Sequence, residues 1–522
     1  MTRNLLSLLA GAVLVAGFWR QGERALAATG PTFDEVAHLA AGYGYWLTGD
    51  FALNPEHPPL LKLWWALPLL FGDAPEYPRE LARDTRDHWQ VAVAWGYAPG
   101  VTYPNFLAAP RRMNLALGAG VVLLSGWWAY RLWGSRLAGV AAAAFAAIDP
   151  TLVSLACVLS TDVGLTFFAL LSAYLLWEYA AKPSRGLLIG AGMSLGLMLG
   201  SKLSAIGMVG ALGLAGVVVL LRGGRLALPN APDTGKRFGP AVDLAFRLAL
   251  IAFVTLAATY GFVHFGEWGR GLKFQLTRGE HGDGAMYLCG ELSRRGWLHY
   301  FLVALALKLP LGLMAGAAGG LASGAWRATW LVVPPLAFVA AASWSRVDLG
   351  VRVVLPAVPY LYVIAGRLGG PGKLREYRVV AVFLAYLFAA ASSRTAAPVP
   401  LTYFNELAGG NGTRYLADSN ADWGQGLPAL RDWMAANGVS AVQLGYFGTD
   451  RPEAYGIRYE PLPGYGRVGP PGGDVLPPGR RVVVVSANLL AGLYLPDPDT
   501  YAAYRKRKPV AVLAGSLWVF EE

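Results

Sequence analysis

Apolar segments recur along most of this chain, and they constrain its fold more than any other feature. A run of about 20 apolar residues is long enough to cross a bilayer as a helix. Of the 522 residues, 55% are hydrophobic and 15% charged, whereas soluble proteins carry about 25% charged residues. This pattern predicts an α-helical polytopic membrane protein with about eleven transmembrane helices, at residues 4–19, 114–133, 137–149, 163–181, 186–200, 203–221, 241–260, 299–317, 329–344, 352–367 and 377–393.

Basic residues gather in every second loop between these segments. The positive-inside rule assigns such loops to the cytoplasmic side, so the net charge of +11 reflects membrane topology and does not indicate a nucleic-acid partner. By parity, the loops 20–113, 149–162 and 261–298 and the tail 394–522 are expected to face outward. The basic residues are Arg131, Arg136, Lys182, Arg185, Arg222, Arg225, Lys236, Arg237, Arg327, Arg367, Lys373, Arg375 and Arg378.

The chain divides into a transmembrane domain at residues 1–393 and a tail at residues 394–522. Within the first part, the loop 20–113 is too long for a plain connector, and its apolar stretches 35–47 and 60–71 are expected to form helices in the membrane interface. The tail is rich in Gly and Pro turns. It is expected to form a small α/β domain, with strands near 439–447, 481–487 and 510–520 and a helix near 426–436.

Two adjacent acids, Asp34 and Glu35, follow the first apolar segment. They lie outside whether residues 5–19 remain as a helix or are removed as a signal peptide. Neighbouring residues on a helix point about 100° apart, so the two acids would have different roles. One would take a proton from an acceptor hydroxyl, and the other would position a sugar, a metal ion or a partner base. The alternative is helix capping by Thr32 or Asp34, with Glu35 at the positive helix end.

A second polar stretch, His57-Pro58-Pro59-Leu60, is followed by Lys62. Pro is tolerated in a first helical turn, which places Lys62 one turn into an interfacial helix. Its ammonium group would bind a phosphate or extend to the membrane interface. Arg111, at the outer start of the next span, has the same two interpretations: it stabilises a leaving phosphate or anchors the helix.

Three further charged residues lie at outer ends of apolar segments. Asp162 enters a span, and an acid in that position is a candidate functional residue; the alternative is helix capping, which Ser160 or Thr161 would also provide. Lys202 would line a groove for a lipid phosphate. Arg352 would contact a phosphate or a sugar, or anchor its span.

Polar residues also cluster in the tail, from Asn405 to Gly410 and from Asp418 to Gln425. Asp, Asn, Gln and Trp suit sugar binding, and they suit the building of turns equally well. The sequence contains no Ser-His-Asp pattern, P-loop, Rossmann fingerprint or CxxC, which argues against hydrolases, ATP-driven pumps and redox enzymes. Cys157 and Cys289 would be unpaired thiols or a single bridge.

These motifs together resemble the C-type membrane glycosyltransferases. The Asp34-Glu35 pair looks like the acidic pair in the first outer loop of that group. His57 to Leu60 followed by Lys62 is similar to the His-Pro-Pro-Leu-Gly-Lys motif of protein O-mannosyltransferases, with Leu61 in place of the Gly. Related enzymes include the aminoarabinose transferases. Further resemblances, in the family's order, lie at Arg111 to Gly118, Thr161-Asp162, Asp348 to Pro356 and Asn405 to Gln425.

The resemblance implies a transferase that takes a sugar from a polyprenyl-phosphate donor and inverts the anomeric centre. Asp34 would be the base, with Glu35 and Asp162 as further catalytic acids, and His57 would contact substrate. Cations would bind the lipid phosphate: Lys62, Arg111, Lys202 and Arg352. The resemblance implies no definite cofactor. It is compatible with a divalent metal ion held by Asp162.

The same resemblance implies the partners and the cellular setting. The partners are membrane lipids, the lipid-linked donor and a glycan, lipid or protein acceptor. The composition suggests a prokaryotic plasma membrane, with the site and the tail outside. The main alternative is a transporter of lipid-linked glycans or polysaccharides that uses the acids as a proton relay. Relay acids should lie in the middle of helices, whereas these acids lie at outer helix ends.

Overall fold

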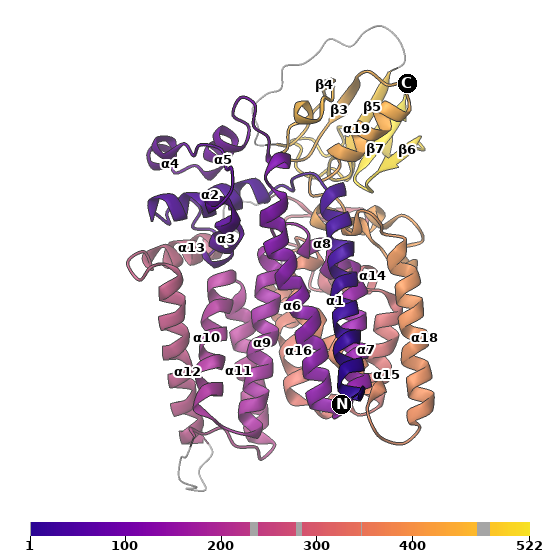
Figure 1. The fold of residues 1–522 in the computed structure, drawn as a ribbon. Helices are drawn as coiled ribbons and strands as arrows, with labels where there is room; N and C mark the ends of the chain where they lie inside the picture. Colours follow the sequence, from indigo (N-terminus) through magenta and orange to yellow (C-terminus); the bar gives the residue numbers. More distant parts are fainter. Residues whose placement is uncertain (1, 230–237, 278–283, 346, 467–480) are drawn as a thin grey trace.

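The computed structural model describes residues 2–229, 238–277, 284–345, 347–466 and 481–522. Lys236 and Arg237 of the expected cytoplasmic loops lie outside these ranges. Long helices run side by side as a bundle, and short helices and a β-sheet lie together at the end of the bundle opposite the N-terminus (Figure 1). The predicted helical membrane architecture is therefore present, with the sheet at one end of the bundle.

Five helical segments of the described residues are long and apolar enough to cross a membrane, or up to seven if each of two bent pairs counts as one span. The five are α6 (Ala108–Trp133), α9 (Thr161–Ala181), α12 (Phe238–Thr259), the segment Val351–Gly369 and α18 (Arg375–Arg394). The pairs are α7 (Arg136–Ile148) with α8 (Pro150–Ala156), and α14 (Tyr300–Lys308) with α15 (Leu311–Ala322). Other bundle helices are α1 (Thr2–Ala28), α10 (Arg185–Ser201), α11 (Ala205–Leu221) and α16 (Thr329–Ser345). The count of eleven spans stays a prediction.

One of the predicted spans bends sharply within its bounds, and another ends where a short helix leaves in a new direction. The segment 299–317 bends by 109° between α14 and α15, where Pro310 follows Leu309. Proline has no N–H to continue the helical ladder, and its ring clashes with the preceding turn. The segment 137–149 likewise ends at Asp149, and α8 leaves at 61° with Pro150 as its first residue.

Short helices cover the end of the bundle opposite the N-terminus. Two of them correspond to the helices expected at 35–47 and 60–71: α2 (Glu35–Thr48), and α3 (Leu60–Ala66) continued by η1 (Leu67–Leu70). Their place in the membrane interface stays a prediction. These two helices can approach closely because Gly42 has no side chain. A Cβ at this position would lie 2.1 Å from the Lys62 carbonyl oxygen. The others are α4 (Arg79–Thr85), α5 (His88–Gly96), η2 (Tyr103–Asn105) and α13 (Gly266–Thr277), with the hairpin β1 (Met286–Leu288) and β2 (Glu291–Ser293).

The tail contains a five-stranded sheet in the order β4-β3-β5-β7-β6. Strands β3 (Val442–Gly445), β4 (Tyr459–Pro461) and β5 (Val482–Ser486) pair in parallel, and β6 (Ala511–Leu513) and β7 (Leu517–Glu521) complete the sheet antiparallel. Helix α19 (Leu427–Ala436) packs its Leu427, Leu430 and Met434 on the sheet. The predicted strand 510–520 is therefore two strands joined by a turn, with positive φ at Ala514 and Gly515.

The remaining short elements lie between and beside these. They are η4 (Ala325–Arg327), η5 (Val351–Ala357), α17 (Val358–Gly366), η6 (Arg367–Gly369), η7 (Pro400–Thr402), η8 (Glu406–Ala408), η9 (Gly412–Arg414), η10 (Asp418–Asn420), η11 (Pro452–Tyr455), α20 (Ala487–Leu490) and α21 (Ala502–Arg505).

The tail holds the segment that precedes α2. The Phe33 N–H donates to the Trp423 carbonyl (2.9 Å), and the Gly30 N–H donates to the Gln425 carbonyl (3.0 Å). The Thr449 hydroxyl donates to the Phe33 carbonyl at 3.0 Å. Because these bonds fix both sides of residue 33, the tail sets the position of the next residue in the chain, Asp34.

Candidate active site

Asp34 lies just before α2, and its carboxylate meets an arginine from a distant part of the chain. Arg352 Nη1 is 3.3 Å from Asp34 Oδ2. Arg352 lies in η5, at the start of the span Val351–Gly369, and its guanidinium stacks over the Trp423 ring at 4.4 Å. The Asp34 side chain is 29% exposed, so a hydroxyl from outside can reach its carboxylate.

A second ion pair joins Asp162 to Lys202. Lys202 Nζ lies 2.5 Å from Asp162 Oδ1. Ser160 caps α9, because its hydroxyl accepts the Asp162 N–H and donates to Asp162 Oδ2. Asp162 is therefore not the cap, and its buried carboxylate binds the lysine. Lys202 also interacts electrostatically with Asp34 and Arg352, so the fold brings four of the seven predicted charged residues together.

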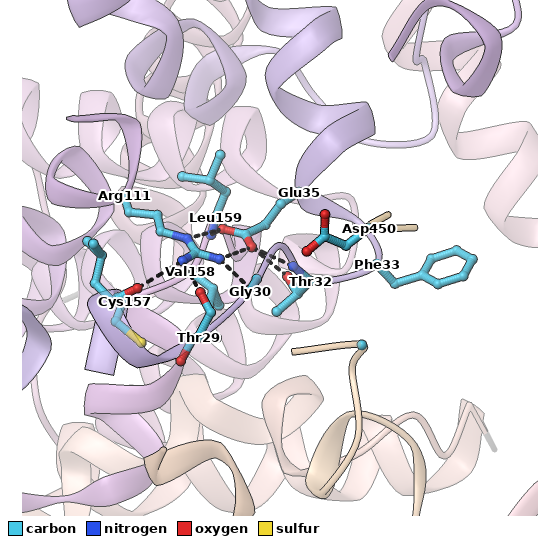
Figure 2. Close-up of polar contacts among 12 residues, drawn as sticks. Thr29, Gly30, Thr32, Phe33, Glu35, Arg111, Cys157, Val158, Leu159 and Asp450 are labelled. Atoms are coloured by element: carbon cyan, nitrogen blue, oxygen red, sulfur yellow. Dashed lines mark hydrogen bonds and ion pairs between the residues drawn. The ribbon is translucent and has the colours of Figure 1, made fainter. Parts of the chain in front are cut away.

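Glu35 and Arg111 bind each other and do not face this cluster. Arg111 Nε and Nη2 donate to the two Glu35 oxygens at 2.9 and 2.6 Å. The other guanidinium N–H groups donate to the carbonyl oxygens of Leu26, in the last turn of α1, and of Thr29 and Gly30, between α1 and α2 (Figure 2). All five donors of the guanidinium are thus used inside the protein.

The Glu35 carboxylate is equally saturated. It accepts the Thr32 N–H (2.7 Å), the Thr32 hydroxyl (3.0 Å) and the Leu159 N–H (2.8 Å) besides Arg111. A glutamate that accepts the backbone N–H three residues before it forms one half of a capping box. This contact agrees with the alternative in which these residues cap the helix. The expected contacts of Glu35 with substrate and of Arg111 with phosphate are therefore corrected: this buried pair positions Asp34.

Lys62 is also buried within the protein. Its ammonium donates to the Tyr45 hydroxyl (2.9 Å), the Asn54 carbonyl (2.6 Å) and Asn54 Oδ1 (3.0 Å), which uses all three of its donors. Burial lowers the pKa of Lys62 well below its usual value. The expected phosphate contact is corrected to a structural role: Lys62 ties the loop before α3 to α2.

Two histidine rings contact each other between Lys62 and the charge cluster, which consists of Asp34, Asp162, Lys202 and Arg352. The rings of His38 and His57 meet edge to face, with centroids 4.8 Å apart. His38 follows Asp34 by one helical turn, and burial, followed by the charge of Lys62, lowers the pKa of His38 well below its usual value. His38 was not singled out from the sequence, although its i+4 spacing from Asp34 was a usable signal. The substrate contact of His57 stays a prediction.

The polar segments of the tail are mostly turn-builders. Asn405 donates to the carbonyls of Ala306 and Leu309, where α14 ends. Asn420 accepts the Val351 N–H, and Gln425 Oε1 accepts the Trp423 N–H. These bonds confirm the turn-building interpretation for the three amides. They also hold Trp423 under the Arg352 guanidinium.

Within the described ranges, no group of three or more His, Cys, Asp or Glu side chains is arranged to hold a metal ion. The acids of the cluster are paired with cations instead: Asp34 with Arg352 and Asp162 with Lys202. A divalent metal ion at Asp162 stays a prediction. Cys157 is buried and Cys289 is exposed, and neither forms a disulfide.

Comparisons with known proteins agree with this architecture. The sequence profile of the family described as dolichyl-phosphate-mannose-protein mannosyltransferase matches residues 97–267, which include Arg111, Asp162 and Lys202. No curated protein sequence matches the chain significantly.

Three solved structures are similar. ArnT from Cupriavidus metallidurans in the apo state aligns with a TM-score of 0.50 and 13% identity, over 100% of this chain and 98% of that one. The same protein bound to undecaprenyl phosphate gives a TM-score of 0.48 and 14% identity, over 98% and 97%. The S. cerevisiae protein O-mannosyltransferase Pmt1-Pmt2 complex bound to the sugar donor gives a TM-score of 0.36 and 18% identity, over 50% of this chain and 34% of the yeast chain.

The chain thus spans about a third of the yeast protein and shares its fold from end to end with apo ArnT. The family match covers the spans that carry half of the charge cluster. The chain is therefore similar to the dolichyl-phosphate-mannose-protein mannosyltransferase family over residues 97–267, and it shares the fold of apo ArnT.

Proposed function

We propose that this protein moves a sugar from a polyprenyl-phosphate donor to a hydroxyl of an acceptor, with Asp34 as the base and with inversion at the anomeric carbon. The transferase class rests on the family match and the fold. The assignment of the base rests on one observation: Asp34 is the half-buried acid of the cluster, 29% exposed, whereas Asp162 is 1% exposed and Glu35 is fully buried.

The reaction needs a proton acceptor on one side of the sugar and a stabilised leaving group on the other. The acceptor hydroxyl gives its proton to an Asp34 oxygen while its own oxygen bonds to the anomeric carbon. The bond from that carbon to the phosphate oxygen breaks, and polyprenyl phosphate leaves with the electron pair. Attack from the face opposite the phosphate inverts the anomeric configuration.

Arg352 and Lys202 are the cations that would hold the lipid phosphate. Both are 15% exposed and lie beside the base, whereas Lys62 and Arg111 have no free donors. Preorganised positive charge stabilises the negative charge that develops on the leaving oxygen. Asp162 fixes the Lys202 ammonium, so it acts through that lysine and needs no contact with substrate.

The setting follows from the predicted topology. The donor lipid stays in the bilayer, the acceptor arrives from the outer side, and residues 394–522 form an extracytoplasmic α/β domain that docks on residues 30–33. A prokaryotic plasma membrane is the proposed location. A transporter is disfavoured, because Asp34 and Asp162 stand at the starts of α2 and α9 and not along a path through the bundle.

The test is donor turnover by the purified protein in lipid. Radiolabelled polyprenyl-phosphate mannose and a crude membrane acceptor fraction are supplied to the wild type, to Asp34→Asn and to Asp73→Asn, an exposed acid of the same outer loop. Transfer should fall at least about 10²-fold in Asp34→Asn, the contribution of a general base, and stay unchanged in Asp73→Asn. Full activity of Asp34→Asn would refute its role as base. A wild type that transfers none of several polyprenyl-phosphate sugars would refute the function itself.

A further inference from the structure

We propose that Tyr494 and Asp418, two residues of the tail, form a sugar-binding element of the active site. This inference rests on the proposed function, because it concerns the substrate of the same site. The Tyr494 hydroxyl donates to Asp418 Oδ2. Asp418 is further fixed by its own N–H, which donates to Asn488 Oδ1 at 2.7 Å, and by the Ser419 N–H, which donates to its Oδ1 at 2.5 Å.

Both residues hold a backbone conformation that side chains rarely adopt. Asp418 has φ 56° and Tyr494 has φ 65°, in the left-handed region that costs energy for residues other than Gly, and more for an aromatic residue than for Asp. Such outliers persist only where the surrounding structure enforces them, and they cluster at functional sites. Here two outliers, 76 residues apart, are joined to each other by a hydrogen bond.

The pair lies beside the proposed base and its arginine. Arg352 interacts electrostatically with Asp34, Asp162, Asp418 and Tyr494, and Tyr494 interacts in turn with Asp34. Arg352 thus interacts both with Asp34, before α2, and with Asp418 of the tail. The tail thus supplies groups of its own to the site, in addition to holding residues 30–33.

Tyr494 also belongs to an aromatic stack that leads to Asp34 along the chain. Its ring lies 4.7 Å from Phe447 and 5.0 Å from Tyr465. Those two rings lie 5.2 and 5.9 Å from Phe33 in stacked orientations. Phe33 precedes Asp34, so four rings from the outer loop and the tail form one platform next to the base.

A neutral sugar ring fits these groups better than a phosphate does. The Tyr494 proton is committed to Asp418, so the phenolic oxygen presents lone pairs that accept a hydrogen bond from a sugar hydroxyl. The Asp418 carboxylate repels an anion and accepts hydroxyl groups, and the aromatic platform covers the apolar C–H face of a ring. The ring would be the transferred sugar of the donor or a sugar of the acceptor.

The experiment compares Tyr494→Phe and Asp418→Asn with a control, Tyr504→Phe, whose hydroxyl donates to the Glu522 carboxylate and not to Asp418. Phe keeps the ring in the stack, and Asn tolerates a positive φ, so both variants should fold. Binding of polyprenyl-phosphate mannose and of sugar-free polyprenyl phosphate is measured directly, without turnover. The KM for the crude membrane acceptor fraction is measured separately.

If the element holds the donor sugar, both variants should bind the mannosyl lipid about five- to tenfold more weakly, the loss of one hydrogen bond, and the sugar-free lipid equally well. If it holds an acceptor sugar, the acceptor KM should rise by the same factor with donor binding unchanged. The inference is overturned if both variants match Tyr504→Phe in all three measurements, or if the acceptor proves to be a sugar-free peptide and donor binding is unaffected. Because binding needs no transfer, a wild type without activity would refute the proposed function, and the donor-binding comparison would still show whether the element holds the donor sugar.

Discussion

The Asp34 carboxylate lies 3.3 Å from the Arg352 guanidinium, although 318 residues separate the two in the chain. The neighbour of Asp34, Glu35, is bonded to a different arginine, Arg111, in the protein interior. Two adjacent acids thus have two different surroundings: Glu35 is in a buried ion pair, and Asp34 is in a partly exposed one. The first prediction follows from this difference.

Glu35→Gln should destabilise the protein and not only reduce activity. It leaves the buried Arg111 guanidinium without its counter-ion, which costs about 3–5 kcal/mol in free energy of unfolding. Asp34→Asn removes only a partly exposed pair and should cost less than about 1 kcal/mol. Thermal unfolding of both variants in detergent gives the comparison. Equal melting temperatures would show that Glu35 does not have the structural role assigned here.

Lys62 and Lys202 should respond differently to the same change to Met. Lys62→Met removes the lysine donor from Asn54 Oδ1 and leaves the Asn54 carbonyl with only the Tyr45 hydroxyl, so it should lower stability and leave the KM for the donor unchanged in the folded fraction. Lys202→Met should raise the donor KM about tenfold, since one charged hydrogen bond to the phosphate is lost.

Asp162→Asn in the Lys202→Met background serves as the control for folding. Lys202→Met alone leaves the Asp162 carboxylate buried and unpaired, which is costly. The double variant removes that charge, so it should regain stability without regaining the donor KM. Recovery of both would mean that Lys202 acts only through folding.

Arg352→Lys should lower kcat about tenfold, and Arg352→Gln about 10²-fold. Lysine keeps the charge near Asp34 but loses the planar group that stacks on Trp423 at 4.4 Å. Glutamine also removes the positive charge that would stabilise the leaving phosphate. Steady-state kinetics at saturating donor separates these effects from binding. Equal activities of the two variants would show that charge at this position is irrelevant.

Stability should depend on pH through Asp450, which joins the tail to the outer loop. Its carboxylate accepts the hydroxyls of Tyr97 and Tyr455, both at 2.6 Å, and burial raises the pKa of Asp450 from 3.8 to about 6. Between these values the folded protein keeps a proton that the unfolded chain has lost. The contribution of Asp450 to stability is therefore lost as the pH rises from about 4 to about 6, by up to about 3 kcal/mol.

The measurement is the melting temperature of the wild type and of Asp450→Asn from pH 4 to pH 8. The amide carries no charge, so the variant should lack this part of the pH dependence and the two curves should diverge below pH 6. Parallel curves over the whole range would contradict a raised pKa for this group. Tyr97→Phe and Tyr455→Phe remove the two hydroxyl donors one at a time and report which contact holds the tail.

The membrane architecture was predictable because it depends on local composition. Long apolar runs specify helices in lipid wherever they occur, and the interfacial helices at 35–48 and 60–70 were readable from their aromatic and apolar residues. The span 137–149 was predicted to end before Pro150, whereas the break at Pro310 inside the span 299–317 was not predicted, although proline marked it. The bend angles of 61° and 109° depend on what each half packs against.

The roles of single residues in the site were likewise only partly predictable from the sequence. The sequence by itself determined a set of charged residues at the outer ends of helices, since charge next to an apolar segment is conspicuous. Only the tertiary structure decided which of these residues can contact a substrate. Every donor of Arg111 and Lys62 is used in a hydrogen bond to a buried carbonyl or side-chain oxygen. Arg352 and Lys202, in contrast, remain partly exposed. A charged side chain looks the same in a sequence whether its partner is a substrate or the backbone of a distant loop, and that partner is set by long-range packing.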